Sequence, residues 1–134
     1  MKEILIIKEP IDKIQSASDL FKRIKKIKID YNQENFILIC LNTKNQILKS
    51  EVLFMGGLNG CLIDPKVIFR KALLNNSNRI IIGHNHPSNC LKPSEEDEDI
   101  YRVLKDLGER LDLRVLDNII FNKKEFYSFQ EGGF

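Results

Sequence analysis

Three consecutive isoleucines, Ile80 to Ile82, run almost directly into the segment His84-Asn85-His86-Pro87. A continuous apolar run such as 79–83 is typical of a strand that is buried on both faces of a sheet, so other elements must cover it. Side chains alternate along an extended chain, and His84 and His86 therefore point to the same side. This stretch predicts a central strand that ends in two converging imidazoles.

Helical and strand-like patterns alternate along the rest of the chain. Residues 36–41 and 47–55 are strand-like, and the polar turn between them indicates a hairpin. We expect further strands at 3–8, 115–121 and 126–129, a loop at Gly56 to Gly60, and helices at about 18–27, 65–74 and 94–111. In the last helix one buried face is expected to carry Ile100, Val103, Leu104, Leu107 and Leu111. The fold class that follows is α/β, a mixed sheet flanked by helices.

The size and composition of the chain are those of one compact unit. It has 134 residues, of which 43% are hydrophobic, and we expect a single domain over residues 1–134. No run of roughly 18 apolar residues is present, and the charges around the first apolar stretch do not have the layout of a secretory signal. These features predict a soluble, cytoplasmic protein with no membrane partner.

Charge and cysteine content argue against two other kinds of site. The net charge of +2 is too small to indicate a nucleic-acid partner by itself, although one segment is basic: Lys22, Arg23, Lys25, Lys26 and Lys28. That basic segment could contact phosphate or could be a solvated helix face. The cysteines at 40, 61 and 90 are widely spaced and form no CxxC pair, so neither a disulfide framework nor a thiolate zinc knuckle is indicated. We expect Cys40 to pack as a small apolar residue.

His84 and His86 are the only histidines in the chain, and a neutral imidazole is a common zinc ligand. The pair alone could also be a chance arrangement at the surface. Ser94 and Asp97 begin the last helix, and its dipole favours the ionised carboxylate that a metal requires. The same two residues could equally form a capping box. Helical spacing alone does not distinguish Asp97 from Glu96 as the third ligand.

The arrangement His84-x-His86, seven further residues, then Ser94-x-x-Asp97 resembles the motif of the JAMM metalloproteases, whose domain is called MPN. The surrounding sequence resembles the RadC branch of that family. This resemblance is strongest over residues 30–134 and rests on 80–88, 93–94, Leu116-Asp117 and 127–129, with weaker similarity at 54–57 and 68–73. It implies an MPN fold, whose architecture is related to that of cytidine deaminases.

The resemblance also implies a role for each residue of the motif. His84, His86 and Asp97 would be the protein ligands of a zinc ion, with a water in the fourth position, which is the arrangement of a catalytic zinc. Ser94 would donate a hydrogen bond to the developing oxyanion.

The JAMM mechanism further needs a glutamate near the start of an upstream strand, which takes a proton from the water and returns it to the leaving group. Glu34, just before the strand at 36–41, fits best, and Glu51 is the second choice. Glu34 could instead be a solvated charge at a strand edge.

Other zinc families do not match, and the match to RadC has departures. The letters His84-Asn85-His86 spell the name of the HNH nucleases, but those three residues are dispersed in that family. The chain has neither the Pro-Cys-x-x-Cys of zinc deaminases nor the HExxH of common metalloproteases. Residues 89–92 replace a glycine-containing loop, and Cys90 within them could approach the metal. Asp64 and Asn118 stand where relatives often carry histidine, which puts substrate contacts in doubt more than metal binding.

These features favour a zinc-dependent metallohydrolase, a peptidase or isopeptidase that uses a metal-bound water on a peptide or protein substrate. One alternative is a metal-containing binding module associated with DNA repair, without turnover, in which the basic segment contacts nucleic acid. We expect the chain to lack the N-terminal helical DNA-binding-like segment of full-length RadC, which weakens that alternative. A scaffold MPN domain without metal is a third, but such domains usually lose the ligands, and here all three are present. Substrate and oligomeric state stay open.

Overall fold

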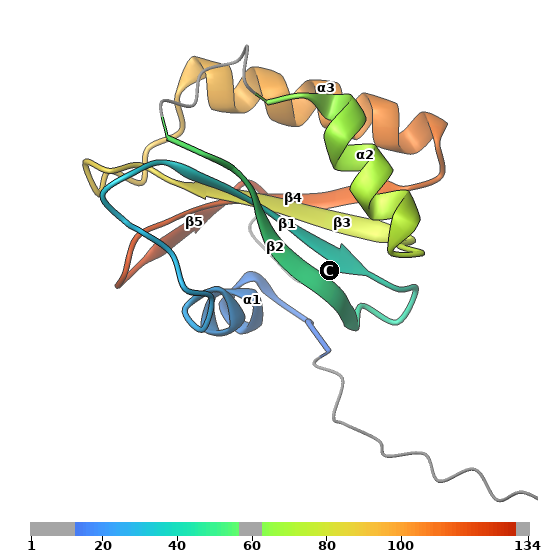
Figure 1. The fold of residues 1–134 in the computed structure, drawn as a ribbon, viewed down its shortest axis with the longest axis horizontal. Helices are drawn as coiled ribbons and strands as arrows, with labels where there is room; N and C mark the ends of the chain where they lie inside the picture. Colours follow the sequence, from blue (N-terminus) through green and yellow to red (C-terminus); the bar gives the residue numbers. More distant parts are fainter. Residues whose placement is uncertain (1–12, 57–62, 131–134) are drawn as a thin grey trace, which may run out of the picture.

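The computed structural model describes residues 13–56 and 63–130. The expected strand at 3–8 and most of the loop that begins at Gly56 lie outside these ranges. The elements are α1 (Ala17–Ile24), β1 (Asn35–Leu41), β2 (Ile47–Met55), α2 (Pro65–Leu74), β3 (Arg79–Asn85), α3 (Glu95–Arg110), β4 (Arg114–Phe121) and β5 (Phe126–Ser128). Figure 1 shows a sheet with helices on both of its faces, which confirms the predicted α/β class.

The five strands form one sheet in the order β2-β1-β3-β4-β5. β1 pairs antiparallel with both β2 and β3, β3 is parallel to β4, and β5 returns antiparallel to β4. The predicted hairpin is therefore confirmed as β1 and β2. β3 is the central strand, and its three isoleucines are fully buried, as expected of a strand that is covered on both faces.

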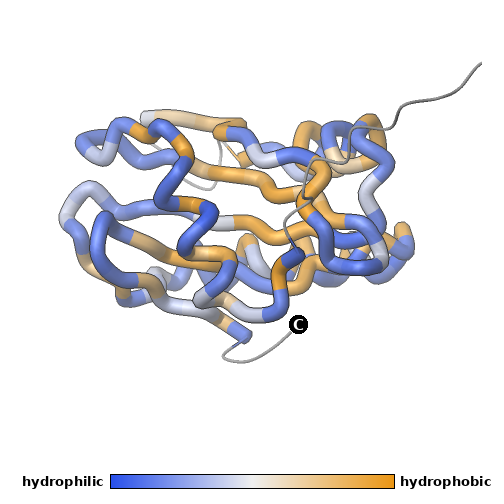
Figure 2. The backbone as a smooth tube through the Cα atoms, turned by 90° about the horizontal axis from the view of Figure 1, so that it is seen from below, coloured by the Kyte–Doolittle hydropathy of each residue, from blue (hydrophilic) through white to orange (hydrophobic). Residues whose placement is uncertain are grey.

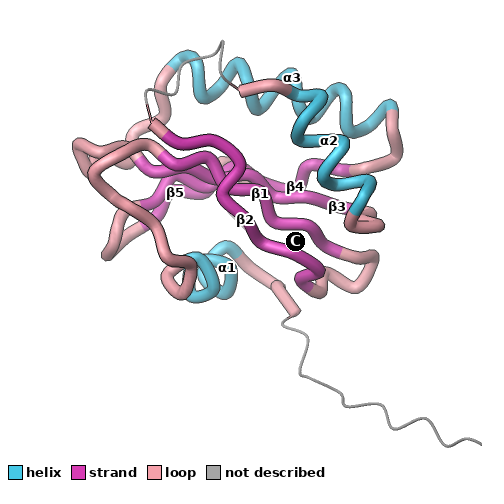
Figure 3. Tube along the Cα trace, viewed as in Figure 1, coloured by secondary structure: helices cyan, strands magenta, loops and turns pink. Residues whose placement is uncertain are grey.

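The sheet separates two apolar cores. α2 and α3 cover one face and α1 covers the other (Figure 3). The core beneath α2 and α3 includes Phe36, Leu38, Ile68, Ile82 and Leu104. The core beneath α1 includes Leu20, Ile24, Ile37, Ile39 and Ile81. Even-numbered residues of β1 thus face α2 and α3, odd-numbered ones face α1, and apolar segments run through the middle of the molecule in Figure 2.

Local capping explains where the first two helices begin. The Asp64 side chain accepts a hydrogen bond from the backbone N–H of Lys66 at 2.9 Å, and Pro65 occupies the first helical position, so α2 has the predicted bounds. α1 is shorter than predicted, because it begins after the cap Ser16 and ends at Ile24. None of the helices among the described residues is long and apolar enough to cross a membrane.

The buried face of α3 differs from the predicted one. Tyr101, Leu104 and Gly108 are buried, whereas Val103 and Leu111 are 47% and 51% exposed. The prediction that Val103 and Leu111 lie in the core was therefore wrong. The buried stripe follows positions 97, 101, 104 and 108, at spacings of three and four residues, so Asp97 lies on the side of α3 that faces the sheet.

Candidate metal centre

The two histidines occupy the end of β3, where the central strand leaves the sheet. His84 pairs with Phe36 of β1 and with Ile120 of β4, and it is 7% exposed. His86 follows the last residue of the strand and is half-buried. Their Nε2 atoms are 3.1 Å apart, so the predicted convergence of the two imidazoles is confirmed.

Asp97 reaches the histidines from the first turn of α3. Its backbone N–H donates to the Ser94 Oγ at 3.0 Å, and its Oδ2 accepts from the Ser94 N–H at 2.8 Å. This is a capping box. The two interpretations of Ser94 and Asp97 are thus compatible, because the cap itself turns the carboxylate of Asp97 towards β3. Glu96 is exposed and outside the cluster.

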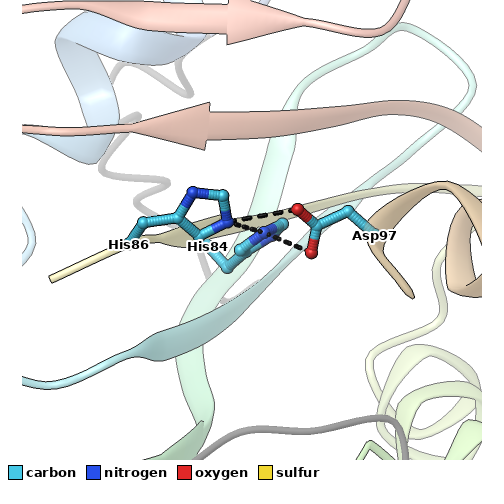
Figure 4. A group of neighbouring side chains, drawn as sticks. All are labelled: His84, His86 and Asp97. Carbon is cyan, nitrogen blue, oxygen red and sulfur yellow. Dashed lines mark hydrogen bonds and ion pairs between the residues drawn. The ribbon is translucent and has the colours of Figure 1, made fainter. Parts of the chain in front are cut away.

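The side chains of His84, His86 and Asp97 converge, and each imidazole meets a different oxygen of the carboxylate (Figure 4). The Nε2 of His84 lies 2.9 Å from Asp97 Oδ1, and the Nε2 of His86 lies 3.1 Å from Asp97 Oδ2. A tetrahedral zinc ion with bonds of about 2.0–2.1 Å separates neighbouring ligand atoms by about 3.3 Å. One ligand atom from each residue lies within 4.8 Å of the other two, and this group could hold a metal ion.

The electrostatics of the cluster favour a carboxylate. Burial opposes ionisation of Asp97, but hydrogen bonds from His84 and His86, and from the Ser94 N–H, outweigh it and hold the pKa of Asp97 well below its usual range. The hydrogen bond to Asp97 raises the pKa of His86, against an opposing effect of burial, and the charge of Glu34 adds to the rise. Asp97 is therefore ionised, and its carboxylate offers the negative charge that a metal ligand needs.

The backbone of Cys90 orients His86. The Nδ1 of His86 lies 2.8 Å from the Cys90 carbonyl oxygen, and only a protonated Nδ1 can bond to that oxygen. A metal that displaces the Nε2 proton bonded to Asp97 would then meet the lone pair that a ligand needs. The Cys90 thiol is exposed and is not part of the ligand group. Cys90 thus contributes its carbonyl, which sequence reasoning missed because backbone groups leave no trace in residue type.

Glu34 lies beside the centre. It immediately precedes β1, and continuing the register in which Phe36 pairs with His84 sets Glu34 opposite His86. Strand alternation puts its side chain on the same face as Phe36 and His84. The charge of Glu34 acts on His86, which also indicates proximity. The alternative Glu51 lies along β2 opposite Leu38 and pairs with Lys71 of α2 at 3.8 Å, so it is engaged away from the histidines.

Asp64 and Asn118, which stand where relatives often carry histidine, both lie outside the ligand group. Asp64 caps α2, as described above. Asn118 in β4 is fully buried, and neither its amide nitrogen nor its amide oxygen has a hydrogen-bond partner among the described residues. A side chain in that position does not contact a substrate at the surface.

The basic segment lies away from the centre. It belongs to α1 and the residues that follow it, and α1 packs on the face of the sheet opposite α3 (Figure 1). The first turn of α3, which carries Asp97, is strongly acidic and also contains Glu95, Glu96 and Glu98. The basic segment and the candidate metal centre therefore lie on opposite sides of the sheet.

Comparison with known proteins gives one consistent family. Residues 14–134 match the family model described as the RadC-like JAB domain. A UPF0758 protein of Chlorobium chlorochromatii is 39% identical over 121 residues, which are 90% of this chain and 54% of the relative. A UPF0758 protein of Staphylococcus haemolyticus is 39% identical over 122 residues (91% and 54%), and one of Methanosarcina barkeri is 37% identical over 128 residues (96% and 56%). The chain spans about half the length of these curated relatives.

Proposed function

Because this chain belongs to the family of RadC-like JAB domains, we propose that it is a zinc-dependent hydrolase that cleaves a peptide or isopeptide bond. The observation that carries the proposal is the convergence of His84, His86 and Asp97, which offer one ligand atom each within 4.8 Å of one another. Imidazole with one carboxylate suits zinc among the common divalent ions. Three protein ligands also match a catalytic site, which keeps a position open, better than a closed structural one.

A zinc ion bound there supplies a Lewis acid that activates water and polarises the carbonyl under attack. Glu34 accepts the proton that this activation releases and returns it to the leaving nitrogen. Its place beside His86, on the ligand side of β1, supports that role. A positioned base contributes about 10² to 10⁴ in rate.

Ser94 stabilises the developing oxyanion. Its oxygen accepts the N–H of Asp97, so the hydroxyl proton can be donated elsewhere. Ser94 is exposed and neighbours the carboxylate ligand through the capping box, which supports contact with a substrate carbonyl. The same side chain thereby orients Asp97 and serves the reaction.

Zinc content and a matched pair of variants test this function. Purified protein should contain about one zinc per chain, and a panel of fluorogenic peptide and isopeptide substrates should identify a cleaved one. On that substrate Glu34→Gln should lower kcat about 10² to 10⁴-fold, whereas Glu51→Gln should keep it. Full activity of Glu34→Gln, or absence of stoichiometric metal, would overturn the mechanism.

The second candidate is a nucleic-acid-binding module associated with DNA repair. Lysines are concentrated on and after α1, and α1 covers the face of the sheet opposite the metal centre. This arrangement favours a nucleic-acid-binding surface that does not need the metal. Salt-dependent binding of DNA that is lost when Lys22, Lys25 and Lys26 are neutralised, and is unchanged by His84→Ala, would support it.

A further inference from the structure

Asn85 stands between the two histidines but points the other way. It is the last residue of β3, and strand alternation directs its side chain away from the side shared by His84 and His86. The residue is 1% exposed. A buried carboxamide destabilises a protein unless its nitrogen and oxygen both find partners, so the partners of Asn85 indicate what it does.

Both ends of the Asn85 carboxamide bond to the backbone that enters β1. Its Nδ2 donates to the carbonyl oxygen of Gln33 at 2.8 Å. Its Oδ1 accepts from the backbone N–H of Asn35 at 2.9 Å. Gln33 and Asn35 are the immediate neighbours of Glu34 in the chain. One side chain of the ligand strand therefore holds the backbone on both sides of Glu34.

Two further hydrogen bonds complete this arrangement. The carbonyl of Glu34 itself accepts from the N–H of Gly56 at 2.8 Å. The Asn35 side chain, which is also fully buried, donates to the carbonyl of Asp30 at 2.8 Å. The carbonyls of Gln33 and Glu34 and the N–H of Asn35 are thus all hydrogen-bonded, although Glu34 precedes the strand. A catalytic group needs such support, because it must be held within about 0.5 Å of its productive position.

We propose that Asn85 is a positioning residue, whose carboxamide fixes Glu34 relative to the metal ligands His84 and His86. This inference rests on the proposed function, in which Glu34 moves the proton. A carboxamide offers the donor and the acceptor that the two backbone groups need on two separate atoms; a carboxylate offers acceptors only, and alanine offers neither. Asn85 thereby makes the base and the two imidazoles one rigid unit.

A spectroscopic test needs no substrate. Cobalt(II) alone, bound to the apo protein in place of zinc, gives visible absorption bands that report the geometry around the ion. Glu34→Gln should shift these bands, because Glu34 borders the site. Asn85→Ala should shift them too in the wild-type background, and should add no further shift in the Glu34→Gln background, because it acts through Glu34.

Asn42→Ala is the matched control. Asn42 also makes three side-chain hydrogen bonds, as Asn85 does, but it follows the opposite end of β1 from Glu34. It should leave the cobalt bands unchanged. If Asn85→Ala does not fold, Asn85→Leu takes its place, since its side chain is of similar size and can bond to neither backbone group.

Each other outcome overturns a specific step. If Asn85→Ala shifts the cobalt bands equally in both backgrounds, it acts on the histidines directly, and the positioning role is wrong. If Asn85→Ala leaves the cobalt bands unchanged while Glu34→Gln shifts them, the hydrogen bonds of Asn85 do not position Glu34, and the inference is wrong. If Glu34→Gln itself shifts nothing, Glu34 is not beside the ion, and the proposed base fails together with Asn85.

Activity gives the second readout once a cleaved substrate is known. Asn85→Ala should lower kcat about 10 to 100-fold, the range found for residues that orient a metal site from outside, with KM nearly unchanged. Amide exchange at Asn35 should also accelerate in this variant. A fall in kcat/KM that comes from KM alone would contradict the assignment.

Discussion

Asp97 in α3 and Asp117 in β4 have opposite protonation preferences. Asp117 in β4 is fully buried, and burial raises its pKa more than its hydrogen bonds from Ser128, Gln130 and Asn118 lower it. Asp97 is also withdrawn from water, but two imidazoles and a helix cap reverse the balance and lower its pKa. The difference lies in the partners. Hydroxyl and peptide groups do not offset the effect of burial on the pKa of Asp117, whereas two imidazoles and the helix cap lower the pKa of Asp97 and keep it ionised, as a metal ligand must be.

Asp97 and Asp117 should respond very differently to the same substitution. Asp97→Asn removes the anionic ligand and should weaken zinc binding by more than about 100-fold, because even residues outside the ligand set cost 10 to 100-fold. Asp117→Asn should keep zinc affinity within a small factor. Competition with a chromophoric chelator measures both. Equal losses of zinc affinity in the two variants would contradict the different roles assigned to Asp97 and Asp117.

The site should depend on only one end of α3. Gly108, near the other end of α3, lies so close to the Leu113 carbonyl oxygen that an added methyl would collide with it. Gly108→Ala should therefore lower the free energy of unfolding by about 1 to 3 kcal/mol, as overpacking does, and urea denaturation measures this. Zinc affinity of the folded variant should stay at the wild-type value. A large loss would mean that Asp97 is positioned by the whole helix and not by its capping box.

The raised pKa of Asp117 predicts how stability depends on pH. The native state holds the proton of the Asp117 carboxyl more tightly than the unfolded chain does. The protonated carboxyl therefore adds to the free energy of unfolding fully below the ordinary pKa of 3.8, and this addition is lost as pH rises through the raised native pKa. Asp117→Asn keeps an oxygen that can accept from the N–H groups of Asn118 and Gln130, but its side chain does not titrate. Wild type should thus lose stability relative to this variant as pH rises. Urea midpoints that diverge in the opposite direction would contradict the assignment.

The smallest effect is expected at Cys90. Its carbonyl, not its thiol, holds His86, and serine keeps the carbonyl. Cys90→Ser should leave zinc affinity within about twofold, which is inside the variation of ordinary surface substitutions. Calorimetric titration of the apo protein with zinc checks it. A tenfold loss would make the thiol part of the site.

Residue pattern predicted much of this molecule. The apolar run at 80–82 predicted the central strand, and the period of two along it predicted that His84 and His86 converge. Asp64-Pro65 predicted the start of α2. These features are local, and each depends on residue type and spacing within a few positions. The assignment of zinc, Glu34 and Ser94 came from family resemblance and stays a proposal.

Other features depended on packing between distant segments. Spacing could not choose between Glu96 and Asp97, because the buried stripe of α3 is defined by Tyr101 and Gly108. The predicted core did not include these two residues. A tyrosine and a glycine are poor signals of burial, yet their spacing from Asp97 could have decided the matter. The bonds of Asn85 to Gln33 and Asn35 join segments about 50 residues apart in the chain. No short-range pattern predicts such a contact.

The most direct test of the metal centre is X-ray absorption at the zinc edge on the purified protein. We expect one zinc per chain with nitrogen and oxygen neighbours at about 2.0–2.1 Å, outer scattering from two imidazoles, and no sulfur neighbour at about 2.3 Å. His84→Ala should remove the signal. A sulfur shell, or a protein that binds no zinc when it is supplied, would contradict a centre made by His84, His86 and Asp97.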